Sequence, residues 1–156
     1  MIVKKWSHYF FDIVEVVKER SKDAETKVGC VIVDKNNRIL STGYNSFPSG
    51  CDDSKLPDTR PDKYPYMVHA EINALLYAKT DLHGTSLYCS ISPCSDCAKA
   101  IVTAGVTKVY FLELYTTFQS TMPFWEACGY RHIISEGFHL LTKDESNIDY
   151  TGWSFF

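Results

Sequence analysis

Residues 84–112 read GTSLYCSISPCSDCAKAIVTAGVTKVYFL, and this stretch decides the fold class. Its apolar runs at 84–91 and 106–112 predict two strands. Residues 94–104 predict a helix, which Gly105 ends because glycine readily adopts the left-handed conformation found at helix C-termini. A helix that connects two strands is typical of a layered α/β domain.

The alternation of strands and helices continues on both sides of this stretch. We expect helices at 6–18, 68–79 and 121–128, and further strands at 28–34, 38–44 and 130–134. Together these elements predict a single domain over residues 1–156. We expect three α/β/α layers around a mixed sheet of about five strands, with helices on both faces. Residues 45–66 form a long loop with four prolines, and a loop of this length inside a compact domain is usually functional or mobile.

The strand–helix–strand stretch contains a pair of candidate metal ligands. Cys94 and Cys97 are three positions apart at the start of the predicted helix, so they share one face of it. Upstream, His69 lies at the start of the helix predicted at 68–79 and is followed by Ala70 and Glu71. One imidazole and two thiolates give three ligands, and a catalytic zinc needs three ligands and an open position for water. Glu71 is then free to move protons.

Each half of this pattern has an ordinary interpretation. The Cys94–Cys97 pair alone is also typical of a redox pair or of half a zinc ribbon, and His69 and Glu71 alone are typical of a helix start with surface charge. The chain lacks the second C-x-x-C of a ribbon and the upstream βαβ unit of a thioredoxin-like protein. Together the motifs read H-x-E…P-C-x-x-C, the established signature of zinc-dependent nucleobase deaminases, which is matched here as a pattern.

Composition narrows the class of substrate. The formal net charge is −3 and no stripe of Lys and Arg is present, which argues against polymeric nucleic acid and fits a small molecule. No secretory signal or apolar run of membrane-spanning length is seen, so we expect a protein of the cytoplasm (the host cytoplasm if viral), with no membrane partner and with reduced thiols. We interpret Cys30 and Cys89 as buried fillers, and Cys51 lacks the local partners that a second zinc would require.

At this point the chain resembles the deoxycytidylate (dCMP) deaminases, over about residues 6–115. The most specific stretches are KVGCVIV at 27–33, STGYN at 41–45, HAEINAL at 69–75 and SPCSDCAKAI at 92–101. Asn73 favours these enzymes over tRNA adenosine deaminases, and deaminases of free cytidine typically have Cys where His69 stands.

The resemblance implies a cytidine-deaminase-like fold and hydrolysis of dCMP to dUMP and ammonia, which supplies thymidylate synthesis. It implies Zn²⁺ on His69, Cys94 and Cys97, with Glu71 as the catalytic acid and base. It also implies a set of substrate contacts: Asn45 to the sugar and base, the Thr26–Lys27 segment and Tyr115 to the 5′-phosphate, and backbone groups of Ala70 and Ser92 to the base edge. The ordinary roles of Asn45 in a turn, of Lys27 in a solvated hairpin and of Tyr115 in packing stay open.

Many members of the family are hexamers that dCTP activates and dTTP inhibits. The resemblance places a regulatory nucleotide at the turn formed by Gly43, Tyr44, Asn45 and Ser46. Ser46 departs from the family's glycine, which leaves this regulation and a strict preference for the monophosphate open. The aromatic residues of the tail at 149–156 are candidates for packing on this chain or on a neighbouring subunit.

Three other functions remain open. One is a dual dCMP/dCTP deaminase, in which Mg²⁺ on a nucleoside triphosphate meets the loop acids Asp52, Asp53, Asp58 and Asp62. Another is a deaminase of a different cytosine or adenine nucleotide. The last is an inactive regulatory paralogue that keeps zinc and binds nucleotide, against which the retained Glu71 argues, since that residue has no ligand role.

Overall fold

The structure is a computed structural model that describes residues 2–143. Its strands form one six-stranded sheet in the order β2-β1-β3-β4-β6-β5. The strands are β1 (Gly29–Val33), β2 (Ile39–Tyr44), β3 (Ser86–Ile91), β4 (Lys108–Glu113), β5 (Tyr130–Ser135) and β6 (Phe138–Lys143). The neighbours β3 and β4 are parallel, and the other neighbouring pairs in the sheet are antiparallel.

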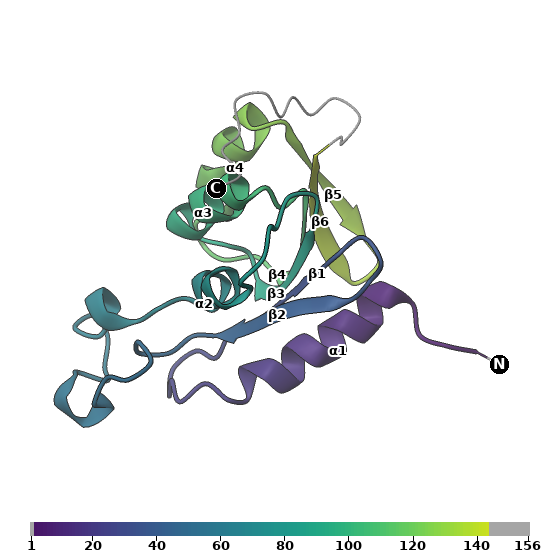
Figure 1. Cartoon of the computed structure of the whole chain (residues 1–156). Coiled ribbons are helices and arrows are strands. Elements are labelled where there is room, and N and C mark those ends of the chain that lie inside the picture. The colour runs from purple at the N-terminus through teal and green to yellow at the C-terminus, as the bar shows by residue number, and fades with distance from the viewer. Residues whose placement is uncertain (1, 144–156) are drawn as a thin grey trace.

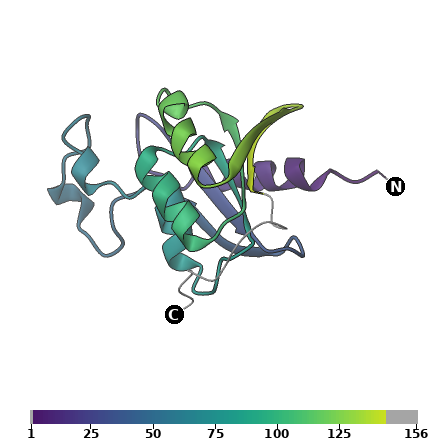
Figure 2. The ribbon, with the colours of Figure 1, turned by 90° about the horizontal axis from the view of Figure 1, so that it is seen from above.

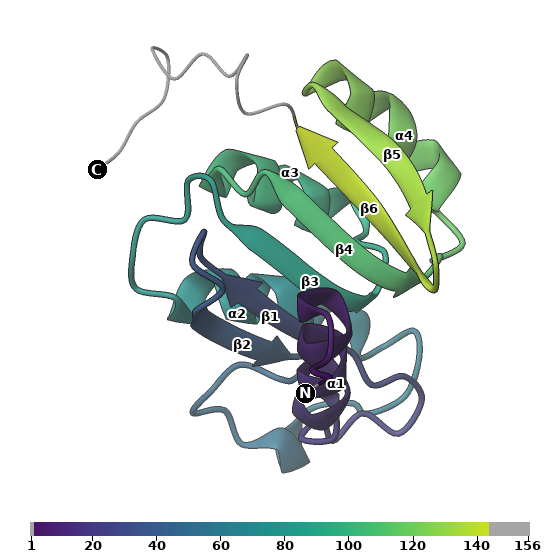
Figure 3. The same cartoon turned by 90° about the vertical axis from the view of Figure 1, so that its right-hand side faces the viewer.

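Helices cover both faces of this sheet. On one face α1 (Trp6–Lys18) crosses β1, β2 and β3. On the other face lie α2 (Ala70–Tyr77), α3 (Ser95–Ala104) and α4 (Phe118–Ala127) (Figures 1 and 3). The predicted three-layer α/β/α architecture with a mixed sheet is therefore confirmed.

Strand alternation divides the core between the two faces. In β1 the side chains of Cys30 and Ile32 belong to the cluster beneath α2, α3 and α4, while Val31 and Val33 belong to the cluster beneath α1. All four are at most 1% exposed. The first cluster extends to the strand and helix ends that carry the His69 and Cys94 motifs, so the core fixes the position of those ends.

The structure adds one strand to those predicted and corrects the bounds of two helices. The sheet has a sixth strand, β6, which pairs with β5 across a turn at Glu136 and Gly137, and Gly137 has a φ of +81°. This strand was missed because it follows β5 after only two residues, without a long loop to separate the runs. Helix α2 begins at Ala70 rather than 68 and ends at Tyr77 rather than 79. Helix α4 begins at Phe118 rather than 121 and accommodates Pro123 within it.

The predicted long loop projects away from the sheet (Figures 1 and 2). It contains two short 3₁₀ helices, η1 (Asp53–Lys55) and η2 (Tyr64–Tyr66). Its two ends are joined by a bridge between Ser46 and Val68, with N–H···O distances of 3.0 and 2.7 Å. In the described part of the chain, no helix has the length and apolarity needed to cross a bilayer. The aromatic tail at 149–156 lies outside the described residues.

Candidate metal and substrate site

The predicted metal ligands meet where two helices begin. His69 is the residue before α2 and Cys94 the residue before α3, both with extended backbone, and Cys97 lies in the first turn of α3. The Nδ1 atom of His69 is 3.3 Å from the Cys97 sulfur and 3.4 Å from the Cys94 sulfur. Tetrahedral zinc with ordinary Zn–N and Zn–S bond lengths separates such atoms by about 3.6 Å. The arrangement therefore fits a zinc ion.

The three side chains also shift one another's pKa values. Hydrogen bonds with Cys97 and His69 lower the pKa of Cys94 to about 4, which favours the thiolate form of its sulfur. The hydrogen bond to this thiolate in turn raises the pKa of Cys97. A thiolate is the form that binds zinc, and the N-terminal end of α3 favours its negative charge.

Glu71 lies in the first turn of α2 and is only 4% exposed. Burial raises the pKa of its carboxyl group, as expected for a residue that must both accept and donate a proton. Its Oε1 accepts a hydrogen bond from the thiol of Cys89 in β3, with a sulfur–oxygen distance of 3.4 Å. The site therefore combines a zinc-type ligand set with a buried carboxyl group that also interacts with the thiol of Cys97.

Glu71, His69 and Cys94 open onto a cleft of about 160 Å³. The lining residues come from the 23–28 segment, the long loop, and the ends of β3 and β4. They are Asp23, Thr26, Val28, Asn45, Arg60, Lys63, Tyr64, Met67, His69, Glu71, Ile91, Ser92, Cys94 and Tyr115. Glu71 and Ser92 are buried at its floor, whereas Arg60, Tyr64 and Tyr115 are exposed at its rim.

Two of the residues expected to contact substrate are partly engaged by the protein itself. Asn45 lines the cleft, but its Oδ1 accepts from Val28 N and its Nδ2 donates to Thr26 O, each at 2.8 Å. One amide proton and one lone pair remain for a ligand. Ser92 also lines the cleft, and its N–H donates to Glu113 O. Of its backbone groups, the carbonyl is therefore the one left to meet a base.

Of the other residues expected to contact substrate, some line the cleft and others do not. Thr26 and Tyr115 line the cleft. Ala70 is fully buried and Lys27 is exposed, and neither is among the lining residues. Of the Thr26–Lys27 segment that the resemblance assigned to the phosphate, Thr26 therefore lines this cleft and Lys27 does not.

Arg60 is a cation in the cleft that the sequence analysis missed. It comes from the long loop, and its Nη2 donates to Thr26 Oγ1 at 2.6 Å while its Nε lies 3.2 Å from Glu25 Oε2. Thr26 and Arg60 are 34 positions apart, and no periodicity connects them. The signal available in the sequence was the presence of basic residues in a loop otherwise rich in Asp and Pro.

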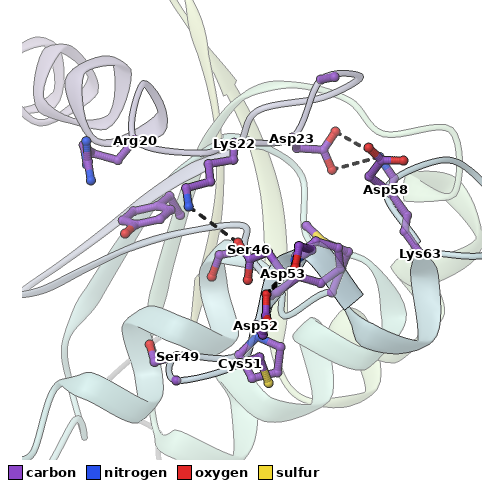
Figure 4. Close-up of a pocket in the computed structure, with 17 residues that line it drawn as sticks. Arg20, Lys22, Asp23, Ser46, Ser49, Cys51, Asp52, Asp53, Asp58 and Lys63 are labelled. Carbon is purple, nitrogen blue, oxygen red and sulfur yellow. Dashed lines mark hydrogen bonds and ion pairs between the residues drawn. The ribbon is translucent and has the colours of Figure 1, made fainter. Parts of the chain in front are cut away.

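A second, larger cavity lies beside the cleft, between the residues that follow α1 and the long loop (Figure 4). Its volume is about 590 Å³, and Arg20, Lys22, Asp52, Asp53 and Asp58 line it. The ion pair of Lys63 with Asp23 borders both this cavity and the cleft, so it forms a wall between them.

The four residues expected to bind a regulatory nucleotide do not share one cavity. Tyr44 and Ser46 line the larger cavity, and Asn45 lines the cleft. Gly43 lines neither and packs under α2, where a Cβ atom would lie 2.3 Å from the carbonyl oxygen of Ala70. Gly43 is therefore required for the close approach of β2 and α2.

Comparisons with known proteins agree with this geometry. Residues 4–113 match the family described as the cytidine and deoxycytidylate deaminase zinc-binding region. The deoxycytidylate deaminase of Pongo abelii is 41% identical over 116 residues, which are 70% of this chain and 65% of that protein, so the chain spans less than two thirds of this relative. The deoxycytidylate deaminase of enterobacteria phage T2 is 30% identical over 157 residues, covering 73% of this chain and 81% of the phage protein.

A solved structure shares the fold as well as the sequence. The dCMP deaminase of cyanophage S-TIM5, in complex with dCMP and dUMP, superposes with a TM-score of 0.69 at 32% identity, covering 83% of this chain and 96% of that one. The match over residues 4–113 includes all three candidate ligands and Glu71. The chain therefore belongs to the zinc-binding cytidine and deoxycytidylate deaminase family.

Proposed function

We propose that this chain hydrolyses dCMP to dUMP and ammonia. The observation that carries the proposal is the buried carboxyl group of Glu71, which lines a cleft next to the His69, Cys94 and Cys97 group. The phage relatives named as dCMP deaminases support the choice of dCMP as substrate. The intact Glu71 argues against an inactive paralogue that only binds nucleotide.

The chemistry assigns a proton-transfer role to Glu71. His69, Cys94 and Cys97 would hold the zinc ion, which supplies Lewis-acid activation of the hydrolytic water. Glu71 takes a proton from that water and delivers it to N3 of the cytosine ring, while the oxygen of the water attacks C4. Glu71 then takes a second proton from the hydroxyl group that is now bonded to C4 and passes it to the amino group, which leaves as ammonia. Its raised pKa suits both directions of transfer.

We assign the 5′-phosphate to Arg60 rather than to Lys27. Among the described residues, Arg60 and Lys63 are the Arg and Lys side chains that line the cleft. Lys63 is paired with Asp23 and Glu25 at 2.9–3.0 Å, and its side chain is 4% exposed. Arg60 uses two of its five N–H donors, one on Thr26 and one on Glu25. The remaining N–H donors of Arg60 lie at the rim of the cleft and are suited to bind two oxygens of the phosphate group. Thr26 and Tyr115 lie on the same cleft and add hydroxyl groups.

The direct experiment measures ammonia release from dCMP, CMP, deoxycytidine, cytidine, dCTP and an adenine nucleotide under identical conditions. The proposal expects dCMP to have the highest kcat/KM. A higher value for dCTP would favour the dual-substrate function, and a higher value for an adenine nucleotide would replace the pyrimidine assignment.

The larger cavity supports a second proposal, a regulatory site. We propose that it binds dCTP or dTTP, with Mg²⁺ on the triphosphate. Arg20 and Lys22 supply positive charge there, and Asp52, Asp53 and Asp58 line it, whereas Asp62 lines neither cavity. Because these acids line the larger cavity and not the cleft, a magnesium triphosphate fits better as effector than as substrate. We further propose a cytoplasmic homohexamer. Rates of dCMP turnover with each effector, with and without Mg²⁺, test the regulation, and light scattering tests the hexamer.

A further inference from the structure

The buried carboxyl group of Glu71 receives a hydrogen bond from the sheet beneath it. Glu71 belongs to α2 and Cys89 to β3, and the Cys89 sulfur lies 3.4 Å from Oε1 of Glu71. Cys89 is fully buried, and Glu71 is 4% exposed. Water therefore has little access to this oxygen from the sheet side, and a buried carboxyl oxygen needs a donor.

We propose that Cys89 is a positioning residue for the deamination reaction, because its thiol donates to Oε1 and holds the Glu71 carboxyl group in one orientation toward the cleft. The inference rests on the proposed function. Glutamate has three side-chain torsions, and fixing them costs conformational entropy. A fixed donor on a rigid strand meets part of this cost before substrate arrives, which is how preorganised groups increase rates.

The thiol is suited to remain a donor. Cys30 lies opposite Cys89 on β1 as its register partner, and both side chains lie in the same buried cluster. The contact with Cys30 and the burial of the site both raise the pKa of Cys89, so its proton is retained near neutral pH.

Cys30 provides a matched control. It is as buried as Cys89, has the same side chain and occupies the paired position on the neighbouring strand. Of these two cysteines, Cys89 is the one that donates to the Glu71 carboxyl group, whereas Cys30 contacts the Cys89 thiol. Replacing either residue with alanine removes the same atoms from the same core, so a difference between the variants reports the hydrogen bond.

The kinetic test compares Cys89→Ala, Cys89→Ser and Cys30→Ala at equal zinc content. We expect Cys89→Ala to lower kcat for dCMP by about five- to tenfold with KM changed less than twofold, in line with the net contribution of one ordinary hydrogen bond. Cys89→Ser keeps a donor and should restore kcat to within about twofold of the unmodified enzyme. Cys30→Ala should also stay within about twofold. Equal losses in Cys30→Ala and Cys89→Ala, or unchanged kcat in Cys89→Ala, would overturn the proposal.

A spectroscopic test does not depend on substrate. The infrared S–H stretching band that disappears in Cys89→Ser should lie at lower frequency than the band that disappears in Cys30→Ser, because a carboxylate acceptor weakens the S–H bond. Glu71→Gln should move the Cys89 band to higher frequency and leave the Cys30 band in place. A Cys89 band that is insensitive to Glu71→Gln would refute the contact even if the enzyme deaminates dCMP. If the band responds but dCMP is not turned over, the failure lies with the proposed function instead.

Discussion

The ammonium group of Lys63 lies 2.9 Å from both carboxylate oxygens of Asp23, and the two side chains are 4% and 6% exposed. This ion pair joins the long loop to the segment after α1. It also borders both the cleft and the larger cavity. Figure 4 draws Asp23 and Lys63 among the residues that line the larger cavity. A carboxylate oxygen of Glu25 lies 3.0 Å from the same ammonium group, so the three side chains form a charge network. The shape of the cleft therefore depends on a buried charge network rather than on the sheet alone.

Removing one partner of this network should destabilise the fold. Lys63→Met leaves the Asp23 carboxylate buried without its cation, and we expect the free energy of unfolding to fall by about 3–5 kcal/mol. Lys22→Met is the control, because its pair with Asp53 is 3.5 Å long and exposed, and it should change stability by less than about 1 kcal/mol. Urea unfolding measures both values. Similar small losses in the two variants would show that the buried network does not hold the loop.

The same pair predicts how stability depends on pH. Burial of Asp23 opposes ionisation, but hydrogen bonds from Thr26 N, Lys63 and Glu25 N outweigh it and lower the pKa of Asp23 below its ordinary value of 3.8. A lowered folded-state pKa contributes stability that is present above the unfolded-state pKa and is lost as pH falls through the folded-state pKa. Unfolding measured from pH 6 to pH 2 should show this loss below about pH 4, and the loss should be smaller in Asp23→Asn. An identical pH dependence in the variant would exclude Asp23 as its source.

The ligand assignment predicts coupled losses of metal and activity. Cys94→Ala and Cys97→Ala should each reduce bound zinc well below about one ion per chain and abolish deamination, because three ligands are the minimum set of a catalytic zinc site. Cys128→Ala, a partly buried cysteine outside the site, serves as the control and should keep both. Atomic absorption and an ammonia assay measure the two quantities. Full activity after exhaustive chelation would contradict a metal-dependent reaction.

The phosphate assignment separates Arg60 from Lys27. Arg60→Gln should raise KM for dCMP by an amount equivalent to about 1.5–3 kcal/mol, and should leave slow deamination of deoxycytidine nearly unchanged, because only the nucleotide carries the phosphate. Lys27→Gln should leave both substrates unaffected, since Lys27 does not line the cleft. Steady-state kinetics with the two substrates give the comparison. A larger effect at Lys27 would restore the role implied by the resemblance.

These differences show which parts of the site the sequence could predict. The His69 and Cys94 motifs were predictable because each begins a helix, and the core places those helix starts together. Arg60 was not, because its position depends on how the long loop folds back onto Thr26 and Glu25. At positions 26 and 27 the prediction named both residues. Thr26 faces the cleft and the adjacent side chain does not, a difference that depends on backbone direction and not on residue type.

The fold could likewise be predicted from the sequence in some parts and not in others. Periodicity predicted the strands and helices around residues 84–112, where buried apolar runs are separated by clear breaks. It missed β6, whose residues are mostly half-buried and therefore give a weak pattern. It also could not predict the larger cavity, because that cavity is formed by two loops.

The proposed role of Glu71 in moving the protons of dCMP deamination can be tested by removing its ability to carry a proton. Production of dUMP from dCMP is followed for the unmodified enzyme and for Glu71→Gln, with zinc content and dCMP affinity determined on the same samples. Glutamine keeps the shape of the side chain but cannot carry the proton. We predict equal zinc, similar dCMP binding and turnover at least about 100-fold slower in the variant. Turnover close to that of the unmodified enzyme, at equal zinc, would contradict the account and assign the proton transfer to another group.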